Sequence, residues 1–506
     1  MDGPASISKS EKGLVSPEVS DYFSAMPSQS VVIRGCDLHL VNLQTRMPFK
    51  YGIATMTRVP HAFLRVRTEV EGIPVVGISG DLLPPKWFTK DPDKPVRDEI
   101  LEMIRVIQHA AELSEGLSGA NAFEIWRQLY QRQDEWGRSE KLPPLLAHFG
   151  TSLVERGLIE VVCRAAGKPF SEMVRTNQLG IRLGEIHPQL RDRNPVDLLP
   201  AKALDKIIAR HTVGLVDPLL DDQISPADRL NDGLPQSLAS CVRAYGLRHF
   251  KIKVTGHLDH DLDRLEQIAQ ILQREAKPDY RFSLDGNEQF KSLADFRAFW
   301  EATERSANLR EFLKHLLFVE QPLHRDMALH ASVARLFAQW PNRPPTIIDE
   351  SDGTLSSLPE ALSLGYAGTS HKNCKGVFKG IANRCLLAQN ERDNPGAQWI
   401  MSGEDLGSIG PVAVIQDLAV ASTLGVHSVE RNGHHYFPGL SMFSKEIQQQ
   451  VLAAHPGLYK SSAAGWPMLD IQEGILDVAS LHKYPFGVGI VLDVEKFTPA
   501  NQFQPA

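Results

Sequence analysis

Five short polar clusters recur along the second half of the sequence, and each follows an apolar or β-branched run. They are FKIKV at 250–254, LDGNEQ at 284–289, FVEQP at 318–322, IIDES at 347–351 and SHKNCKG at 370–376. A polar group that ends such a run is typical of the tip of a buried strand. The clusters repeat about every 23 to 35 residues, the length of one strand plus one helix in a (β/α)₈ barrel. The sequence therefore predicts a barrel whose polar strand ends meet at one mouth.

Three carboxylates would enter this mouth from neighbouring strands: Asp285, Glu320 and Asp349. Carboxylate oxygens are hard ligands of the kind that Mg²⁺ prefers, and three of them leave positions for water or a substrate oxygen. Helix caps and turns are the alternative roles for such residues. Three carboxylates in order at strand ends favour a metal site, for which we expect Mg²⁺, with Mn²⁺ as the alternative.

Lysines flank the expected metal site on two sides. Lys251 and Lys253 are two residues apart on one strand, so both point into the barrel lumen, and Lys372 arrives from the opposite side. Opposed ammonium groups beside a cation cost stability, which indicates a functional role. We expect Lys253 to act as a general base, with Lys251 as a partner that tunes it or contacts the substrate carboxylate.

The motifs K-x-K, D-x-N, E-Q-P, D-E-S and K-x-x-K-G, in this order, resemble the enolase superfamily. The lysine pair together with a lysine on the sixth strand is similar to the muconate lactonizing enzyme group, which includes dipeptide epimerases, N-acylamino acid racemases and o-succinylbenzoate synthases. The resemblance implies an α/β fold in which an N-terminal α+β capping domain covers a modified TIM barrel. It also implies Mg-dependent removal of the α-proton of a carboxylate through an enediolate. A racemase or epimerase is favoured; a cycloisomerase, a lyase and a barrel that only binds a ligand are the alternatives.

The sixth strand allows more than one catalytic group. The sequence S-H-K-N-C-K-G-V departs from the family's usual N-I-K-x-x-K-G-G, and a register slip of one residue would turn His371 inward in place of Lys372. Lys375 is a third candidate for the catalytic group of this strand, although we expect it in the following loop, where lysines are usually solvated.

Other polar residues are expected to support this site. Asn287 and Glu350 would orient the metal ligands and Lys253 through hydrogen bonds. Glu404 stands where a seventh strand should end and would assist the site.

The eighth strand bears on the substrate. Glu430 and Asn432 stand where dipeptide epimerases usually have D-x-D-G. A single carboxylate, partly neutralised by Arg431, predicts a pocket that disfavours a free amine at the distal end of the substrate. We interpret His427, His434 and His435 as surface or pocket-polar side chains, because the metal ligands look complete without them.

The domain organisation follows from these motifs and from their flanks. The predicted segments are a flexible leader at 1–29, the capping domain at 30–177, an insertion at 178–210, the barrel at 211–482 and a C-terminal return to the cap at 483–506. The first barrel strand is predicted at 211–217, and a second insertion at 438–468. Segment 44–58 resembles the family's mobile specificity loop, with Arg46, Lys50 and Tyr51 as residues that close over the substrate.

Composition and charge limit the classes of partner that we expect. A net charge of −7 without a basic run argues against nucleic acid, and the sequence has neither a membrane-length apolar stretch nor a signal peptide. Five cysteines without metal-ligand spacing indicate reduced thiols. We therefore expect a cytoplasmic homo-oligomer that acts on a small-molecule carboxylate, away from membranes.

Overall fold

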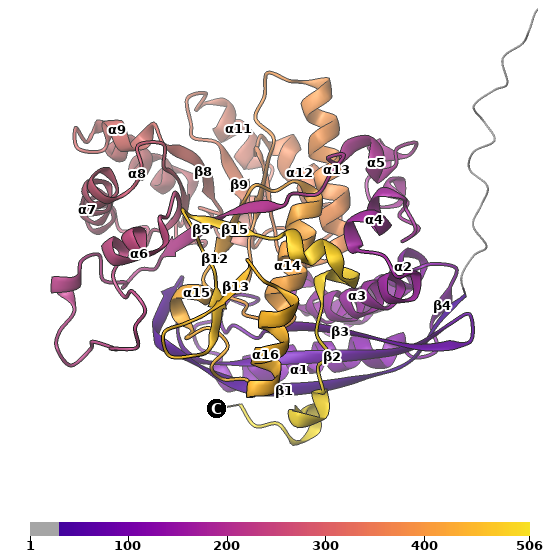
Figure 1. The fold of residues 1–506 in the computed structure, drawn as a ribbon. Helices are drawn as coiled ribbons and strands as arrows, with labels where there is room; N and C mark the ends of the chain where they lie inside the picture. Colours follow the sequence, from indigo (N-terminus) through magenta and orange to yellow (C-terminus); the bar gives the residue numbers. More distant parts are fainter. Residues whose placement is uncertain (1–29, 506) are drawn as a thin grey trace, which may run out of the picture.

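The structure, a computed structural model, describes residues 30–505; the predicted leader at 1–29 lies outside the described residues. Figure 1 shows an antiparallel sheet with its helices early in the chain and, against one side of it, a parallel barrel surrounded by helices. The C-terminal end of the chain returns to the antiparallel sheet. The predicted fold class, a (β/α)₈-type barrel with an α+β cap, is confirmed.

The cap is built on a sheet in the order β16-β1-β2-β3, with β4 paired to β1. Its elements are β1 Val31–Tyr51, β2 Ala54–Val70, β3 Ile73–Leu82, α1 Val96–Ser114, β4 Ser118–Gly119, α2 Ala122–Ser139, α3 Pro144–Ala166 and α4 Phe170–Arg175. Strands β2 and β3 are joined by a tight turn at Glu71 and Gly72, whose φ angles are 51° and 79°. Two successive left-handed residues are what a tight two-residue hairpin needs.

Helix α3 is buried along nearly its whole length and contacts both the cap sheet and the start of α13 in the barrel. A Cβ atom on Gly77 of β3 would lie 2.1 Å from the carbonyl oxygen of Gly157, so glycine is required for this close approach. Glu155 of α3 accepts hydrogen bonds from the backbone N–H groups of Val377 and Phe378, just after the sixth barrel strand. Helix α3 thereby fixes the cap relative to the barrel mouth.

Within residues 30–505, eight parallel strands form a barrel that closes through pairing of β12 with β5. The strands are β5 Lys206–Val213, β6 His249–Lys253, β7 Arg281–Asp285, β8 Leu316–Glu320, β9 Thr346–Ile348, β10 Gly368–His371, β11 Ile400–Gly403 and β12 Ser428–Arg431. Helix α5 Pro195–Leu198 precedes the first of these strands. The helices between and after the strands are α6 Leu238–Tyr245, α7 Leu258–Glu275, α8 Leu293–Arg305, α9 Arg310–Leu313, α10 Arg325–Ala328, α11 Ser332–Ala338, α12 Ser357–Leu364, α13 Val377–Asp393, α14 Ala413–Leu424, α15 Gly433–Tyr436 and α16 Lys445–Ala454. The short C-terminal strands are β13 Tyr459–Ser461, β14 Pro467–Leu469, β15 Ile475–Asp477 and β16 Thr498–Pro499.

The first barrel strand begins earlier than predicted, at Lys206 instead of 211, so residues 206–210 belong to the barrel and not to an insertion. Its first residues pair with β15, whose position in the sequence gives no sign of this pairing. The strand also ends earlier, because the Asp217 carboxylate accepts a hydrogen bond from Gly214 N–H and turns the chain.

Segment 44–58 is not a loop. It is the end of the β1–β2 hairpin, paired from Phe49 with Met56 to Tyr51 with Ala54 and turning at Gly52. Alternation continues through the segment and buries Phe49, Tyr51 and Met56, which explains why it stays in the sheet.

The predicted second insertion at 438–468 contains α16 and β13 and packs beside the cap. The Phe443 ring lies 6.2 Å from that of Phe63 on β2, measured between centroids, and Phe497 stacks on Phe63 at 4.8 Å. Strand β16 then pairs with β1. Across the described part of the chain, no helix combines the length and the apolar character needed to cross a membrane.

Candidate active site at the barrel mouth

The polar strand ends meet at one level of the barrel. In the parallel register, Lys253 lies beside Asp285, and Asp285 lies beside Glu320. Asp349 and Lys372 follow directly after β9 and β10. All five side chains are buried, as expected for the lining of a barrel lumen.

Three carboxylates form the tightest oxygen cluster of this mouth: Glu320, Asp349 and Glu404 each offer an oxygen within 4.8 Å of the other two. The Oδ2 atom of Asp349 is buried and accepts no hydrogen bond from residues 30–505. Buried carboxylate oxygens are normally partnered, so an unpartnered one among three carboxylates fits a divalent cation with hard oxygen ligands. The described residues therefore suit a metal such as Mg²⁺.

Asp285, the third ligand expected from the sequence, is engaged differently. Its Oδ2 atom accepts a hydrogen bond from Lys253 at 2.6 Å and lies 3.0 Å from Lys251 Nζ. Its Oδ1 atom accepts the backbone N–H of Asn287. Glu404, predicted only to assist the site, takes the third place in the carboxylate cluster.

Lys251 lies at the centre of the charged network. Its Nζ atom is 2.9 Å from Glu320, 2.7 Å from Glu404 and 2.9 Å from Glu430. Burial alone would lower the pKa of Lys251, but the surrounding carboxylates hold it well above its usual value. Lys251 is therefore a fixed positive charge that offsets the repulsion among these carboxylates.

Lys253 and Lys372 reach the site from opposite sides of the barrel, because three strands separate β6 from β10 in either direction around the closed sheet. Lys372 Nζ lies 2.8 Å from Asp349 and 2.7 Å from Glu404. Burial opposes the charge of Lys372, but these two carboxylates raise its pKa well above the usual value.

The register of the sixth strand directs Lys372, and not His371, toward the carboxylates. The His371 ring packs against Gly380 of α13, on the outside of the barrel, and contacts Asn373 at 3.1 Å. Lys375 differs from the prediction, since it is buried and its Nζ atom lies 2.8 Å from Asp349 Oδ1. A short 3₁₀ turn at Asn373–Lys375 folds it back to the site instead of into solvent.

Asn287 and Glu350 contact each other as a supporting pair. Asn287 donates from Nδ2 to Glu350 at 3.2 Å, and burial with the nearby Asp349 charge raises the pKa of Glu350 to about 7. Lys90 of the cap donates to the Asn287 carbonyl oxygen and lies 3.3 Å from Glu288. The sequence analysis missed Lys90, which belongs to a connection without any motif.

Glu430 and Asn432 also point into the mouth, where Glu430 accepts hydrogen bonds from Thr212 at 2.6 Å and from Asn432 at 3.0 Å. Arg431 does not neutralise Glu430 as predicted; it pairs with Asp405 at 2.9 Å. Successive strand residues face opposite sides of the barrel wall, so the Arg431 side chain points away from the Glu430 carboxylate. Lys251, which faces the lumen, pairs with Glu430 instead.

The charged groups line a pocket with about 410 Å³ of empty space. Its apolar wall comes largely from the cap and consists of Phe49, Tyr51, Met56, Pro84 and Trp87, with Leu406 from the barrel. Trp87, which no motif marked, also places its ring 5.3 Å from Lys372 Nζ.

The three residues of segment 44–58 that were predicted to close over the substrate lie in different environments. Tyr51 lines the pocket and donates from its hydroxyl to Pro85. Arg46 instead binds Asp232 at 2.6 Å, and Lys50 is not part of the lining. The hairpin therefore contributes apolar surface more than charge.

The histidines of the eighth strand behave in two ways. His427 is exposed, as predicted. His434 and His435 were predicted as surface or pocket-polar side chains, but both are buried and neither lines the pocket at the barrel mouth. The short helix α15 turns both of them behind the barrel wall.

Comparisons with known proteins agree with this architecture. Residues 234–374 match the family described as enolase C-terminal domain-like. No curated protein sequence matches the chain.

Solved structures share the fold at low sequence identity. N-succinyl Arg/Lys racemase from Bacillus cereus is 14% identical, with a TM-score of 0.59 over 92% of this chain and 98% of that one. A dipeptide epimerase from Cytophaga hutchinsonii, complexed with Mg and D-Ala-L-Val, is 13% identical, with a TM-score of 0.57 over 92% and 99%. A muconate lactonizing enzyme from Pseudomonas fluorescens, complexed with muconolactone, is 17% identical, with a TM-score of 0.55 over 92% and 98%. The resemblance predicted from the motifs is confirmed: residues 234–374 match the enolase C-terminal domain-like family, and the chain shares the fold of solved racemase and muconate lactonizing-type structures.

Proposed function

We propose that this chain is a divalent-metal-dependent enzyme that removes the α-proton of a small carboxylate substrate and acts as a racemase or epimerase. The observation that carries the proposal is the approach of Lys253 and Lys372 from opposite sides of one pocket that also contains the carboxylate cluster. Similar folds solved with magnesium and mandelic acid, or with Mg and a dipeptide, support Mg²⁺ as the cofactor.

The two lysines would act on opposite faces of the substrate. Lys253 has one carboxylate partner, Asp285, and takes the α-proton on its side as a general base. Lys372 returns a proton on the other side, which inverts the carbon centre. Bound at Glu320, Asp349 and Glu404, a divalent cation would stabilise the negative oxygens of the enediolate.

Neighbouring groups hold this machinery in position. The backbone N–H of Asn287 donates to Asp285, and the side chain of Asn287 donates to the buried Glu350. The apolar wall from the cap excludes water from the reacting carbon, which strengthens the electrostatic interactions inside the pocket.

The state of Glu430 bears on the substrate class. Lys251, Thr212 and Asn432 already satisfy its carboxylate, so little negative charge remains to bind a free ammonium group. We therefore expect N-acylated amino acids, or hydroxy and cyclic acids, to be better substrates than free dipeptides.

A cycloisomerase or lyase is the second candidate, and one asymmetry favours it. Lys372 has three carboxylate partners, Asp349 and Glu404 in close contact and Glu320 at 4.0 Å, whereas Lys253 has one. A lysine held in this way suits the role of a permanently charged group that stabilises the intermediate. Lys253 would then be the only base.

The test is solvent isotope exchange. The protein is incubated in D₂O with Mg²⁺ and pooled carboxylic acids, and mass spectrometry follows the α-position of each acid. Deuterium incorporation is expected for at least one acid, and inversion separates the racemase from the cycloisomerase or lyase. A complete lack of exchange and turnover, with ligand binding retained, would instead identify a barrel that only binds.

A further inference from the structure

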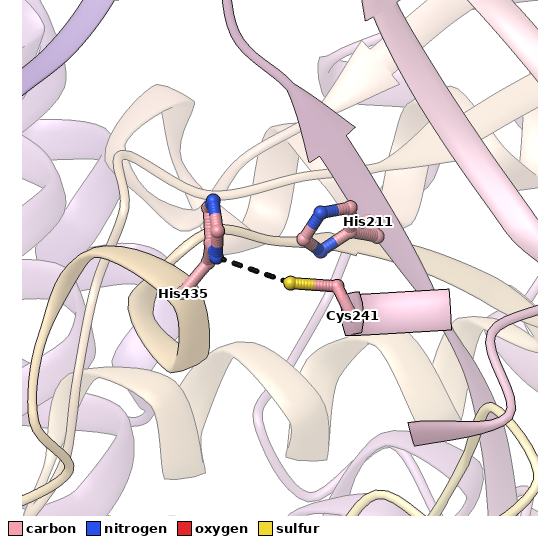
Figure 2. Close-up of side chains that lie close together, drawn as sticks. All are labelled: His211, Cys241 and His435. Atoms are coloured by element: carbon pink, nitrogen blue, oxygen red, sulfur yellow. Dashed lines mark hydrogen bonds between the residues drawn. The ribbon is translucent and has the colours of Figure 1, made fainter. Parts of the chain in front are cut away.

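Three metal-binding side chains from separate segments of the chain lie close together (Figure 2). His211 comes from β5, Cys241 from α6 and His435 from α15, and one ligand atom of each lies within 4.8 Å of the other two. All three are buried. None of them lines the pocket described above.

The donor atoms suit a metal that the barrel mouth does not favour. Imidazole nitrogen and thiolate sulfur are preferred by Zn²⁺ and similar transition metals, whereas Mg²⁺ requires oxygen. A thiol bound to a divalent metal loses its proton, so Cys241 would bind as a thiolate whose negative charge the metal balances.

His435 is oriented as a metal ligand would be. Its Nδ1 atom faces Cys241 Sγ, while its Nε2 atom lies 3.7 Å from the Asp217 carboxylate. Asp217 is itself fixed by Tyr436, whose hydroxyl donates to it at 2.6 Å, and by Gly214 N–H. A carboxylate behind the second nitrogen of a histidine ligand is the usual support in zinc sites.

The edge of the cluster between Cys241 and His435 has the length of an edge of a zinc coordination tetrahedron. With Zn–N of about 2.0–2.1 Å and Zn–S of about 2.3 Å, a tetrahedral ion holds its nitrogen and sulfur ligands about 3.5 Å apart. Cys241 Sγ and His435 Nδ1 are 3.5 Å apart. His434 Nε2 lies 3.1 Å from His211 Nδ1 and so contacts that ring from outside the trio.

We propose that His211, Cys241 and His435 form a second metal site that binds one Zn²⁺ ion, with water as the fourth ligand. The site would join the first barrel strand to its helix and to α15. Helix α15 directly follows Glu430 and Asn432, and Arg46 of the cap hairpin donates to the His435 carbonyl oxygen at 2.9 Å. The ion would therefore stabilise one wall of the pocket without contacting a substrate.

Cobalt spectroscopy tests the proposal on the full-length protein. The chelator-treated protein, saturated with Mg²⁺ to fill the oxygen site, is titrated with Co²⁺. Binding at the proposed site produces a thiolate-to-cobalt charge-transfer band that saturates at one equivalent, while cobalt at the barrel mouth, with oxygen ligands only, produces none. Zn²⁺ should then abolish the band by displacement.

Variants separate this site from other thiols. Cys241→Ser and His435→Gln should lose the band or weaken cobalt binding at least tenfold, and Cys385→Ser, which changes an equally buried cysteine on α13, should retain it. The wild-type spectrum does not depend on any variant folding correctly. No band in the wild-type protein, or a full band in folded Cys241→Ser, would refute the zinc site and leave these residues as ordinary hydrogen-bonded core side chains.

Discussion

Adjacent residues on strand β5 enter two different chemical environments. Thr212 faces the lumen, where its hydroxyl donates to Glu430 within a network of lysines and carboxylates. His211 faces outward, where it meets other imidazoles and a thiol. One wall of the barrel thus separates a charged oxygen-rich site from a neutral nitrogen- and sulfur-rich cluster.

The same contrast recurs on β10, where the residue after the strand, Lys372, meets carboxylates and His371 packs outside against α13. The difference teaches that charge is tolerated inside because each buried lysine has carboxylate partners. Outside, burial keeps the histidines neutral, as the lowered pKa values of His211 and His371 indicate.

The largest expected effect distinguishes the carboxylates that would bind the metal from Asp285, which pairs with lysines. Glu320→Gln keeps the size of the side chain but removes a charge from the cluster, so Mg²⁺ affinity should fall by more than about 100-fold, and exchange activity should be lost. Calorimetric titration with Mg²⁺ measures this.

Asp285→Asn is the matched comparison. Asp285 is paired with lysines and lies outside the oxygen trio, so its variant should bind Mg²⁺ more tightly than Glu320→Gln does. Equal losses in the two variants would restore Asp285 as a ligand, as the motifs alone suggest.

Much of the inner site was predictable because strand ends repeat at a regular interval. Apolar runs identified β6 to β9, and parallel pairing then brings Lys253, Asp285 and Glu320 side by side. The register of β10 left Lys372 and His371 as alternatives, and packing of His371 on Gly380 decides between them.

Other features needed the folded chain. The outer cluster combines a strand, a helix and a turn that are far apart in sequence, so His211, Cys241 and His435 share no motif spacing. Lys90 and Trp87 reach the pocket from a connection in the cap. The early start of β5 depends on pairing with β15 near the end of the chain.

Stability measured across a pH series tests whether His371, which lies outside the barrel, is uncharged in the folded protein. Burial lowers the pKa of His371 to about 4, so the unfolded chain takes up this proton near pH 6.5 and the folded chain does not. The resulting stability is present above pH 6.5 and is lost as the pH falls toward 4. His371→Asn should remove on the order of 1–3 kcal/mol of this loss, measured by urea unfolding at each pH.

The control is His427→Asn, which makes the same substitution at an exposed histidine. Its stability should depend on pH as that of the wild-type protein does. If His371→Asn loses stability between pH 6.5 and 4 as steeply as the wild type, His371 is charged in the folded protein.

The smallest expected effect concerns charge at the eighth strand. Asn432→Asp adds a second carboxylate beside Glu430, which should improve turnover of substrates with a free amine relative to N-acylated ones by roughly fivefold, equivalent to about 1 kcal/mol. Ratios of kcat/KM across a substrate panel measure the change. Efficient epimerisation of Ala-Glu-type dipeptides by the unmodified protein would contradict the reading of Glu430 as already neutralised.

The central claim is that Lys253 and Lys372 serve opposite faces of one substrate. Its most direct test is α-deuterium exchange from each separate enantiomer of an active substrate, in Lys253→Ala and Lys372→Ala, with exposed Lys314→Ala as the control. Each inner variant should lose exchange by roughly 10²- to 10⁴-fold from one enantiomer, and the two variants should affect opposite enantiomers. Exchange from both enantiomers that survives the loss of either lysine would contradict the claim.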